Sequence, residues 1–179
     1  GEWYHLAGYE FMWEQAFDSL SLTFTGLAAF VLGLVSHFSK DYLHQERGFL
    51  RFYLLTLVLG VGVEIILLAA AMDQVFFGWE LVGLSSALLI AFFSHRPGPA
   101  SGGVRAFLTY RFCDIGLLAA VVVIHHGGTA TSFASQGGSW LQLAARSTEQ
   151  QNLLLVLLLL LACAGKSALV PFGGWLPRA

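Results

Sequence analysis

Long apolar runs dominate this chain. The hydrophobic positions do not alternate with polar ones at the two-residue period of a half-buried strand. Instead they continue for about 18 to 20 residues, the length at which a helix crosses roughly 30 Å of hydrocarbon. The runs extend from Ser19 to Phe38, Phe52 to Met72, Val75 to Ser94, Val104 to His126 and Leu153 to Val170. This pattern predicts an all-α, polytopic bundle with five transmembrane helices.

Composition supports a membrane location. Hydrophobic residues make up 56% of the 179 residues and charged residues 11%, with a mean hydropathy of +0.70. An ordinary soluble domain carries about 25% charged residues. A water-soluble fold of this composition would expose too much apolar surface, so the lipid bilayer is the expected partner. The net charge of -2 and the lack of a dense basic cluster argue against nucleic-acid binding.

Basic residues are distributed unevenly between the connections. Lys40, Arg47 and Arg51 flank the connection between the first two runs, and Arg96 and Arg105 flank the connection between the third and fourth. The other two connections carry one basic residue between them. The positive-inside rule therefore places the basic connections in the cytoplasm. Residues 1–18 form a predicted outer-side segment before the first helix.

Glycine, proline and small polar residues mark two loops and the chain ends. His95 to Gly103 is rich in Pro and Gly and is predicted to be a loop that stops the third helix. Gly127 to Ser139 is predicted to be a longer outer loop. The chain starts at Gly1 without a methionine and stops at Ala179 within a Pro and Gly-rich stretch, so we expect a piece truncated at both ends.

Five ionisable residues fall well inside the predicted spans: Glu64, Glu80, Arg111, Asp114 and Lys166. Each costs about 2.5 to 3.5 kcal/mol at the middle of a membrane on insertion scales. Retention of five such residues by chance is improbable. They therefore require partners, water or a function, and we interpret them as candidate proton or cation carriers.

The residues alone leave structural alternatives open for this set. Arg111 and Asp114 are three positions apart, so they share a helix face and can form a local ion pair that only staples two helices. Glu80 lies between Gly78 and Gly83, which allow a tight helix interface, or it is an acid near the outer surface. Glu64 is either a second proton-accepting acid or the partner of a residue outside this chain.

Lys166 ends a long apolar run and precedes Pro171 by five residues. Proline removes a backbone hydrogen bond, and Gly173 and Gly174 allow further distortion, so the last helix should be discontinuous near Pro171. A lysine beside broken backbone at membrane depth is typical of ion sites in transporters. The alternative is a lysine that extends to the cytoplasmic surface.

Other candidate motifs do not support a cofactor, metal or covalent chemistry. Gly165 to Ser167 copies the end of a phosphate-binding loop, but the first glycine of that motif is missing. His125 and His126 are adjacent and lack the four-residue spacing of a helical metal site. Cys113 and Cys163 lie in apolar runs and are interpreted as packing residues. No nucleophile and base can be paired, so this chain holds no predicted catalytic site.

Three motifs in order resemble the antiporter-like family, which includes the large proton-pumping membrane subunits of respiratory complex I and the Mrp cation/proton antiporters. They are Phe77 to Leu84, Tyr110 to Asp114, and Gly165 to Pro177. The resemblance implies that residues 19–179 are part of a proton-conducting transmembrane domain.

The resemblance also implies roles for the buried charges. Glu80 corresponds to the family's motif glutamate and Lys166 to the lysine with which it pairs, on the discontinuous helix. Arg111 and Asp114 match an Arg-x-x-Asp motif that tunes this pair. Glu80 would then control the protonation of Lys166, which passes its proton to polar residues of later helices.

Other details resemble the membrane subunits of DAB-type inorganic-carbon transporters. The complex I subunits usually read Cys-Ser-Tyr where this chain has Leu84 to Ala87, and Asn where it has Tyr110. Ser85 to Phe93, Arg96 to Pro99 and the His125-His126 pair look more like the carbon transporters. This implies cation-coupled inorganic-carbon uptake with a zinc-containing, carbonic-anhydrase-like partner in a bacterial plasma membrane. The alternative is a pumping subunit of an NADH:quinone oxidoreductase or an Mrp-type antiporter.

Overall fold

The computed structural model describes residues 2–6, 9–46, 48–126, 133 and 147–179. In chain order the elements are β1 (Glu2–Leu6), β2 (Tyr9–Met12), α1 (Ser19–Tyr42), α2 (Phe49–Leu67), α3 (Met72–Ile90), α4 (Pro97–His126), α6 (Glu149–Lys166) and the 3₁₀ helix η1 (Phe172–Arg178). All five of the α-helices described are long and apolar enough to cross a membrane. The predicted all-α polytopic fold with five spans is therefore confirmed.

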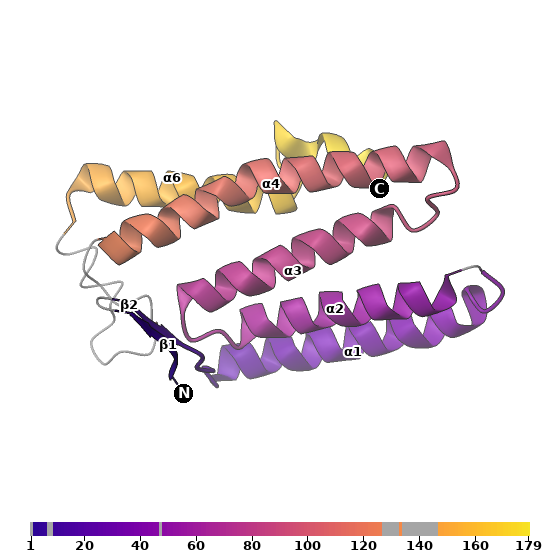
Figure 1. The fold of residues 1–179 in the computed structure, drawn as a ribbon, viewed down its shortest axis with the longest axis horizontal. Coiled ribbons are helices and arrows are strands. Elements are labelled where there is room, and N and C mark those ends of the chain that lie inside the picture. Colours follow the sequence, from indigo (N-terminus) through magenta and orange to yellow (C-terminus); the bar gives the residue numbers. More distant parts are fainter. Residues whose placement is uncertain (1, 7–8, 47, 127–132, 134–146) are drawn as a thin grey trace.

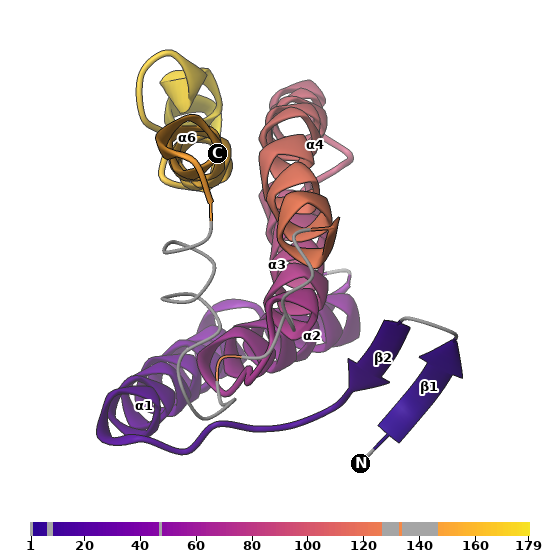
Figure 2. The same ribbon diagram turned by 90° about the vertical axis from the view of Figure 1, so that its left-hand side faces the viewer.

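The helices run back and forth along one direction (Figure 1). The connections before α2 and before α4, which the basic residues flank, lie at the same end, and the N-terminal hairpin lies at the other. Figure 2 looks along the bundle and shows α1 and α2 side by side, with α3 and α4 following and α6 next to α4. Each helix thus packs mainly on its neighbours in sequence, in the order α1, α2, α3, α4 and α6.

Glycines allow the closest helix approaches in this bundle. A Cβ added to Gly78 of α3 would lie 2.7 Å from the carbonyl oxygen of Gly62 on α2, closer than real side chains come. On α4, a Cβ on Gly116 would collide with the carbonyl oxygen of Leu158 on α6. Small residues at such crossings are how membrane helices gain van der Waals contact. They hold α3 against α2, and α6 against α4, at the depth of the buried charges.

The second predicted span is too long at its C-terminal end, because it included Met72, which begins α3. Helix α2 ends at Leu67. The residues that follow pair instead with the segment before α1, where the Ala16 N–H donates to the Leu68 carbonyl at 2.9 Å. This pairing satisfies backbone groups that would otherwise continue the helix.

The predicted loop from His95 to Gly103 is wrong for most of its length, because α4 begins at Pro97. The first turn of a helix tolerates proline, since its N–H groups have no partner within the helix. Gly103 fits inside α4 because a Cβ there would lie 2.8 Å from the Ala87 carbonyl oxygen of α3. The other predicted loop, Gly127 to Ser139, lies outside the described residues except for Phe133.

The outer-side segment that the sequence predicts before the first helix contains two antiparallel strands, β1 and β2, which the hydrophobic pattern did not predict. The segment leads into a capped helix start. Asp18 Oδ1 accepts from the Ser21 N–H at 2.6 Å, and Ser21 Oγ accepts from the Asp18 N–H at 3.0 Å. These hydrogen bonds hold the pKa of the Asp18 carboxyl below its usual value, with the Ser21 backbone N–H contributing most.

Candidate functional site

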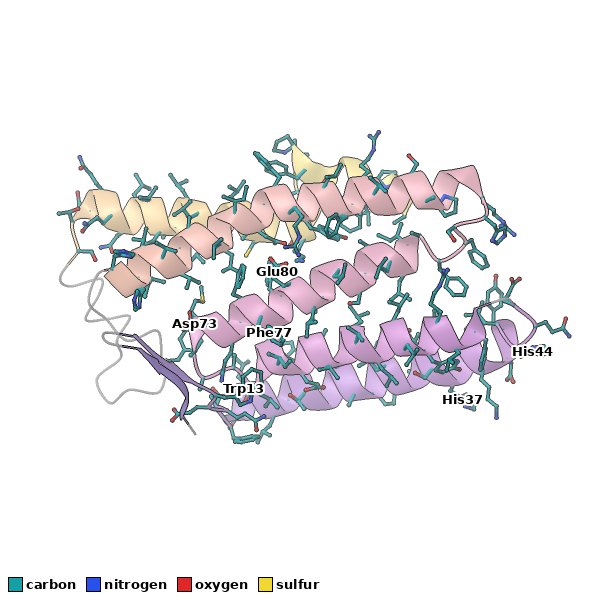
Figure 3. The ribbon with its side chains drawn as sticks, in the orientation of Figure 1. Trp13, His37, His44, Asp73, Phe77 and Glu80 are labelled. Carbon is teal, nitrogen blue, oxygen red and sulfur yellow. The ribbon has the colours of Figure 1, made fainter. Side chains whose placement is uncertain are left out.

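Four of the five predicted ionisable residues gather between α3, α4 and α6. Glu80 lies on α3 and faces the neighbouring helix (Figure 3), and its carboxylate forms an ion pair with the Arg111 guanidinium of α4. Lys166, the last residue of α6, lies 3.8 Å (Nζ to Oδ2) from Asp114 of α4. The bundle thus contains two adjacent cross-helix ion pairs.

These pairs differ from the ones that the sequence predicted. A local pair between Arg111 and Asp114 was one alternative that the sequence left open, but each of them pairs with a residue of a different helix. The resemblance implied a direct pair between Glu80 and Lys166, and among the described residues that contact is not made. Helix α4 instead presents a guanidinium to Glu80 and a carboxylate to Lys166, about one turn apart.

Trp79 makes a hydrogen bond with each member of the Lys166–Asp114 ion pair. Its indole Nε1–H donates to Asp114 Oδ1 at 2.6 Å, and its backbone carbonyl accepts from Lys166 Nζ at 3.1 Å. The Lys166 ammonium also lies 5.4 Å from the centre of the Trp79 ring and 4.7 Å from that of Tyr110. Aromatic faces at this range stabilise a desolvated cation.

Gly83 leaves the space that the Lys166 ammonium occupies. A Cβ built on Gly83 would collide with Lys166 Nζ. Because Gly83 follows Trp79 by one helical turn, its missing side chain exposes the Trp79 carbonyl to a donor from outside the helix. The glycine therefore acts as a contact surface for the ammonium.

Asp114 is the most enclosed member of the cluster, with its side chain 3% exposed. Its Oδ1 is occupied by the Trp79 indole, whereas Oδ2 is buried and accepts no hydrogen bond. Oδ2 faces the ammonium of Lys166, whose side chain is 14% exposed. At this distance Oδ2 serves as a counter-charge for the ammonium and keeps a lone pair free to accept a hydrogen bond.

The position of Lys166 depends on where α6 ends. After Lys166 the chain turns, with Ala168 at a φ of 53°, and Pro171 lies at the start of η1. The Trp175 indole of η1 donates to the Gly165 carbonyl at 3.1 Å and stacks edge-on against Tyr110 at 5.0 Å. The folded-back η1 thereby caps the end of α6 inside the bundle. The last helix is discontinuous, as predicted, but α6 ends at Lys166 and not at Val170, where the predicted fifth span ended.

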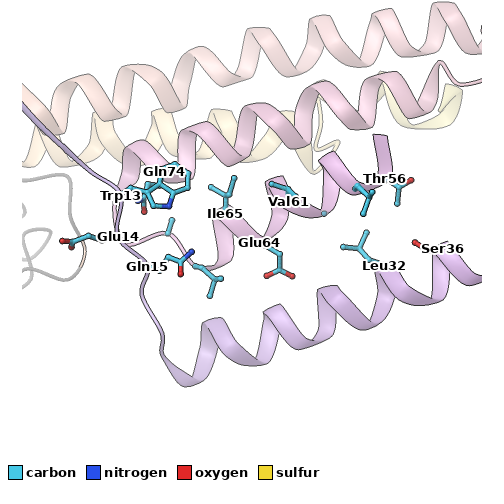
Figure 4. Close-up of a pocket in the computed structure, with 14 residues that line it drawn as sticks. Trp13, Glu14, Gln15, Leu32, Ser36, Thr56, Val61, Glu64, Ile65 and Gln74 are labelled. Carbon is cyan, nitrogen blue, oxygen red and sulfur yellow. The ribbon is translucent and has the colours of Figure 1, made fainter. Parts of the chain in front are cut away.

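Glu64, the fifth predicted residue, lies apart from this cluster. It projects from α2 toward α1 (Figure 4) and lines a different cavity. Its Oε2 is buried and makes no hydrogen bond. The described structure does not join it to the four charges between α3, α4 and α6.

Sequence reasoning missed Trp79, Tyr110 and Gly83 as parts of the site. All three lie within the quoted motifs, where Trp79 directly precedes Glu80 and Tyr110 directly precedes Arg111. The signal in the sequence that could have identified them was their closeness along the chain to charged residues inside the predicted spans. Their roles depend on how three helices cross. The periodicity of a single helix does not predict that arrangement.

A double-mutant cycle distinguishes the observed pairs from the local pair. We expect Asp114→Asn to destabilise the protein by about 3 kcal/mol, because it leaves a buried ammonium without its counter-charge. When Lys166→Met is added to the Asp114→Asn protein, it should lower the free energy of unfolding by less than Lys166→Met alone does. Thermal unfolding of the purified protein measures both. In the control cycle of Asp114→Asn with Arg111→Gln, the coupling should be clearly smaller, and an equal or larger coupling there would contradict the observed pairing.

Family comparisons agree with the motifs that carry these residues. Residues 69–179 match the family described as "NADH:quinone oxidoreductase/Mrp antiporter, TM". Residues 3–53 match the family described as "NADH-Ubiquinone oxidoreductase (complex I), chain 5 N-terminus". The first match contains α3, α4 and α6 and hence all four clustered charges.

The chain is also similar to chloroplastic NAD(P)H-quinone oxidoreductase subunit 5 of several organisms. It is 34% identical to the Nephroselmis olivacea protein over 104 residues, which cover 58% of this chain and 16% of the relative. The Phaseolus vulgaris protein is 34% identical over 104 residues, covering 58% and 14%. The Oryza sativa protein is 38% identical over 88 residues, covering 49% and 12%.

The matched parts are less than a fifth of the length of these curated relatives. The match to the transmembrane family, in contrast, covers more than half of this chain. As the three motifs predicted, the protein is a multi-pass membrane protein that belongs to the NADH:quinone oxidoreductase/Mrp antiporter transmembrane family.

Proposed function

We propose that this chain is the ion-conducting part of a proton-translocating membrane subunit of an NADH:quinone oxidoreductase. Redox chemistry would occur in other subunits, and this chain would move protons across the bilayer. The observation that carries the proposal is the Lys166 ammonium held beside Asp114 at the broken end of α6. The names of the similar proteins support the choice of complex.

Lys166 and Asp114 supply the proton-carrying pair in this proposal. Both groups are removed from bulk water, and only one oxygen of Asp114 is hydrogen-bonded. In such surroundings the charged states depend strongly on neighbouring charges, because the local dielectric is low. A change of charge nearby is therefore sufficient to shift the proton between the pair and its next acceptor.

Arg111 supplies that change of charge. Its side chain is 42% exposed and pairs with Glu80, yet it lies three residues before Asp114 on the same face of α4. When a proton neutralises Glu80, the guanidinium loses its partner and can turn toward Asp114. Lys166 then shares its counter-charge with a second cation, which favours release of its proton. Glu80 would control Lys166 through Arg111 and Asp114, without touching it.

Inorganic-carbon uptake is the second candidate function. It is favoured by the residues from Ser85 to Phe93 and Arg96 to Pro99 and by the His125-His126 pair, and it would need a zinc-containing partner. The similar proteins named above support the quinone oxidoreductase instead. Both candidates use the same buried charges. The bacterial plasma membrane stays a prediction, as does the domain boundary at residue 19.

The two candidates separate in cells that cannot grow in air because they lack carbonic anhydrase. The intact protein, expressed with its neighbouring gene, should not restore growth if it belongs to a quinone oxidoreductase. Growth that Lys166→Ala abolishes would establish inorganic-carbon transport and contradict our choice. Detection of the protein in the membrane by immunoblot controls for expression.

Removal of the lysine should stop transport without preventing insertion. We expect Lys166→Ala to abolish proton movement, because no other described residue places an ammonium beside Asp114. Glu80→Gln should have the same or nearly the same effect, since it removes the charge that holds Arg111. Proton uptake into sealed membrane vesicles, measured with a pH-sensitive dye, tests both. Lys40→Ala, at the end of α1, is the matched control and should transport normally.

Normal transport by either Lys166→Ala or Glu80→Gln would remove that residue from the ion path. Loss of transport in Lys40→Ala as well would show that the assay responds to any loss of a lysine.

A smaller change tests the geometry of the same pair. We expect Gly83→Ala to keep the protein folded, because the added methyl collides only with the flexible end of Lys166 and makes an ordinary contact with Asp114 Oδ2. The ammonium must shift, and the rate of proton transport should fall by about tenfold or more, because a misplaced reacting group reacts much more slowly. Gly33→Ala, which meets nothing within 4 Å, should leave transport unchanged. Unchanged transport in Gly83→Ala would show that the ammonium does not work at the observed position.

A further inference from the structure

A cavity with a mainly apolar lining and a few polar side chains lies between α1, α2 and the segment that precedes α1 (Figure 4). Its volume is about 350 Å³, enough for several water molecules. Glu64, Thr56 and Ser36 line it together with Glu14 and Gln15. It is separate from the paired charges between α3, α4 and α6, and the proposed mechanism does not use it.

Two buried side-chain oxygens in this cavity make no hydrogen bond with any described residue. Thr56 is 5% exposed and its Oγ1 makes no hydrogen bond. Glu64 Oε2 is likewise buried without a hydrogen bond. Both residues lie on one face of α2 because they are eight positions apart, with Gly60 between them. Burial of such groups without a partner costs free energy, so water or a ligand must satisfy them.

The charge of the cavity selects the sign of that ligand. Two carboxylates line it, those of Glu14 and Glu64, and none of its described lining residues is basic. An anion would be repelled, and a cation would be attracted by both carboxylates. Hydroxyl oxygens such as that of Thr56 and carboxylate oxygens are the ligands that hard cations and protonated water prefer.

The cavity extends from the hairpin end of the bundle toward its middle. Its lining runs along α2 from Leu68 to Thr56, twelve residues or about 18 Å of helix. At the hairpin end the segment 14–16 pairs with residues 68–70. Leu32 of α1 lies between Glu64 and the deeper hydroxyl groups (Figure 4). A cation that enters from the hairpin end reaches Glu64 before this leucine.

We propose that this cavity is a water-filled site for a monovalent cation, with Glu64 as its binding carboxylate and access from the predicted outer side. The cation is a proton or an alkali ion, and the Thr56 hydroxyl binds water at the inner end of the cavity, about 12 Å along α2 from Glu64. This inference extends the proposed transport function by adding a second cation site. Its test measures access and charge rather than transport, so the two can fail separately.

The first test is the reactivity of Thr56→Cys in the intact protein, from which other reactive cysteines have been removed. A cationic methanethiosulfonate added to the outer side of sealed vesicles should modify this thiol, because the reaction needs water and a thiolate. Leu54→Cys, on the same helix but outside the cavity lining and 54% exposed at the apolar surface, is the matched control and should not react.

The sign of the charge is tested with an anionic methanethiosulfonate. The Thr56→Cys thiol should react faster with the cationic reagent, and Glu64→Gln should reduce this preference by about tenfold, as one carboxylate at roughly 12 Å predicts. An unreactive Thr56→Cys would mean that lipid or another helix fills the cavity, which overturns the proposal. Equal rates for both reagents, or a preference that Glu64→Gln leaves unchanged, would also overturn it.

A carbodiimide identifies the ion without any substitution. Dicyclohexylcarbodiimide modifies protonated carboxyl groups in apolar surroundings, and mass spectrometry of the peptide locates the adduct. We expect an adduct on Glu64. If sodium suppresses it at constant pH, the ligand is an alkali ion, and if only rising pH suppresses it, the ligand is a proton. Absence of an adduct on Glu64 at acidic pH would contradict the proposal.

Discussion

The cost of holding a charge away from water shapes this protein. An ion inside hydrocarbon is tolerated only when a counter-charge, a dipole or water replaces its hydration. Lys166 has three such replacements. Asp114 supplies the counter-charge, the Trp79 carbonyl accepts a hydrogen bond, and two aromatic rings face the ammonium. Lys166 is also in the last turn of α6, where the helix dipole favours a cation.

The same constraint explains why the helices approach so closely. The ammonium reaches the Trp79 carbonyl only because Gly83 has no side chain, and α6 fits beside α4 because Gly116 and Gly165 have none. Closer packing shortens the distances between charges and strengthens their interaction. The close helix packing at the glycines and the geometry of the ion pairs therefore depend on each other. A substitution at one of these glycines should move the charged groups, and loss of a charged group should alter the helix packing.

The sequence was sufficient for the existence of five long helices and for the residues that carry charge, because both follow from local patterns, but it was not sufficient for the helix ends. Runs of about 20 apolar residues define a span, and an acid inside such a run is conspicuous. The partners were not predictable in this way. Arg111 and Asp114 share a helix face, which suggested a local pair, yet Glu80 and Lys166 on neighbouring helices compete for them. The start of α4 was missed because Gly103 is needed for close contact with Ala87 of α3, which the local pattern does not reveal.

In the proposed mechanism, Lys166 exchanges a proton under the control of Asp114, and Glu80 influences this exchange only indirectly. Solid-state NMR of the intact protein with ¹⁵N-labelled lysine observes the Lys166 Nζ directly, and Lys166→Met identifies its signal. We expect this signal to titrate within the pH range in which the protein transports protons. Asp114→Asn should shift the titration strongly and Glu80→Gln much less. An ammonium that keeps its proton throughout that range, or a larger shift in Glu80→Gln, would contradict the account.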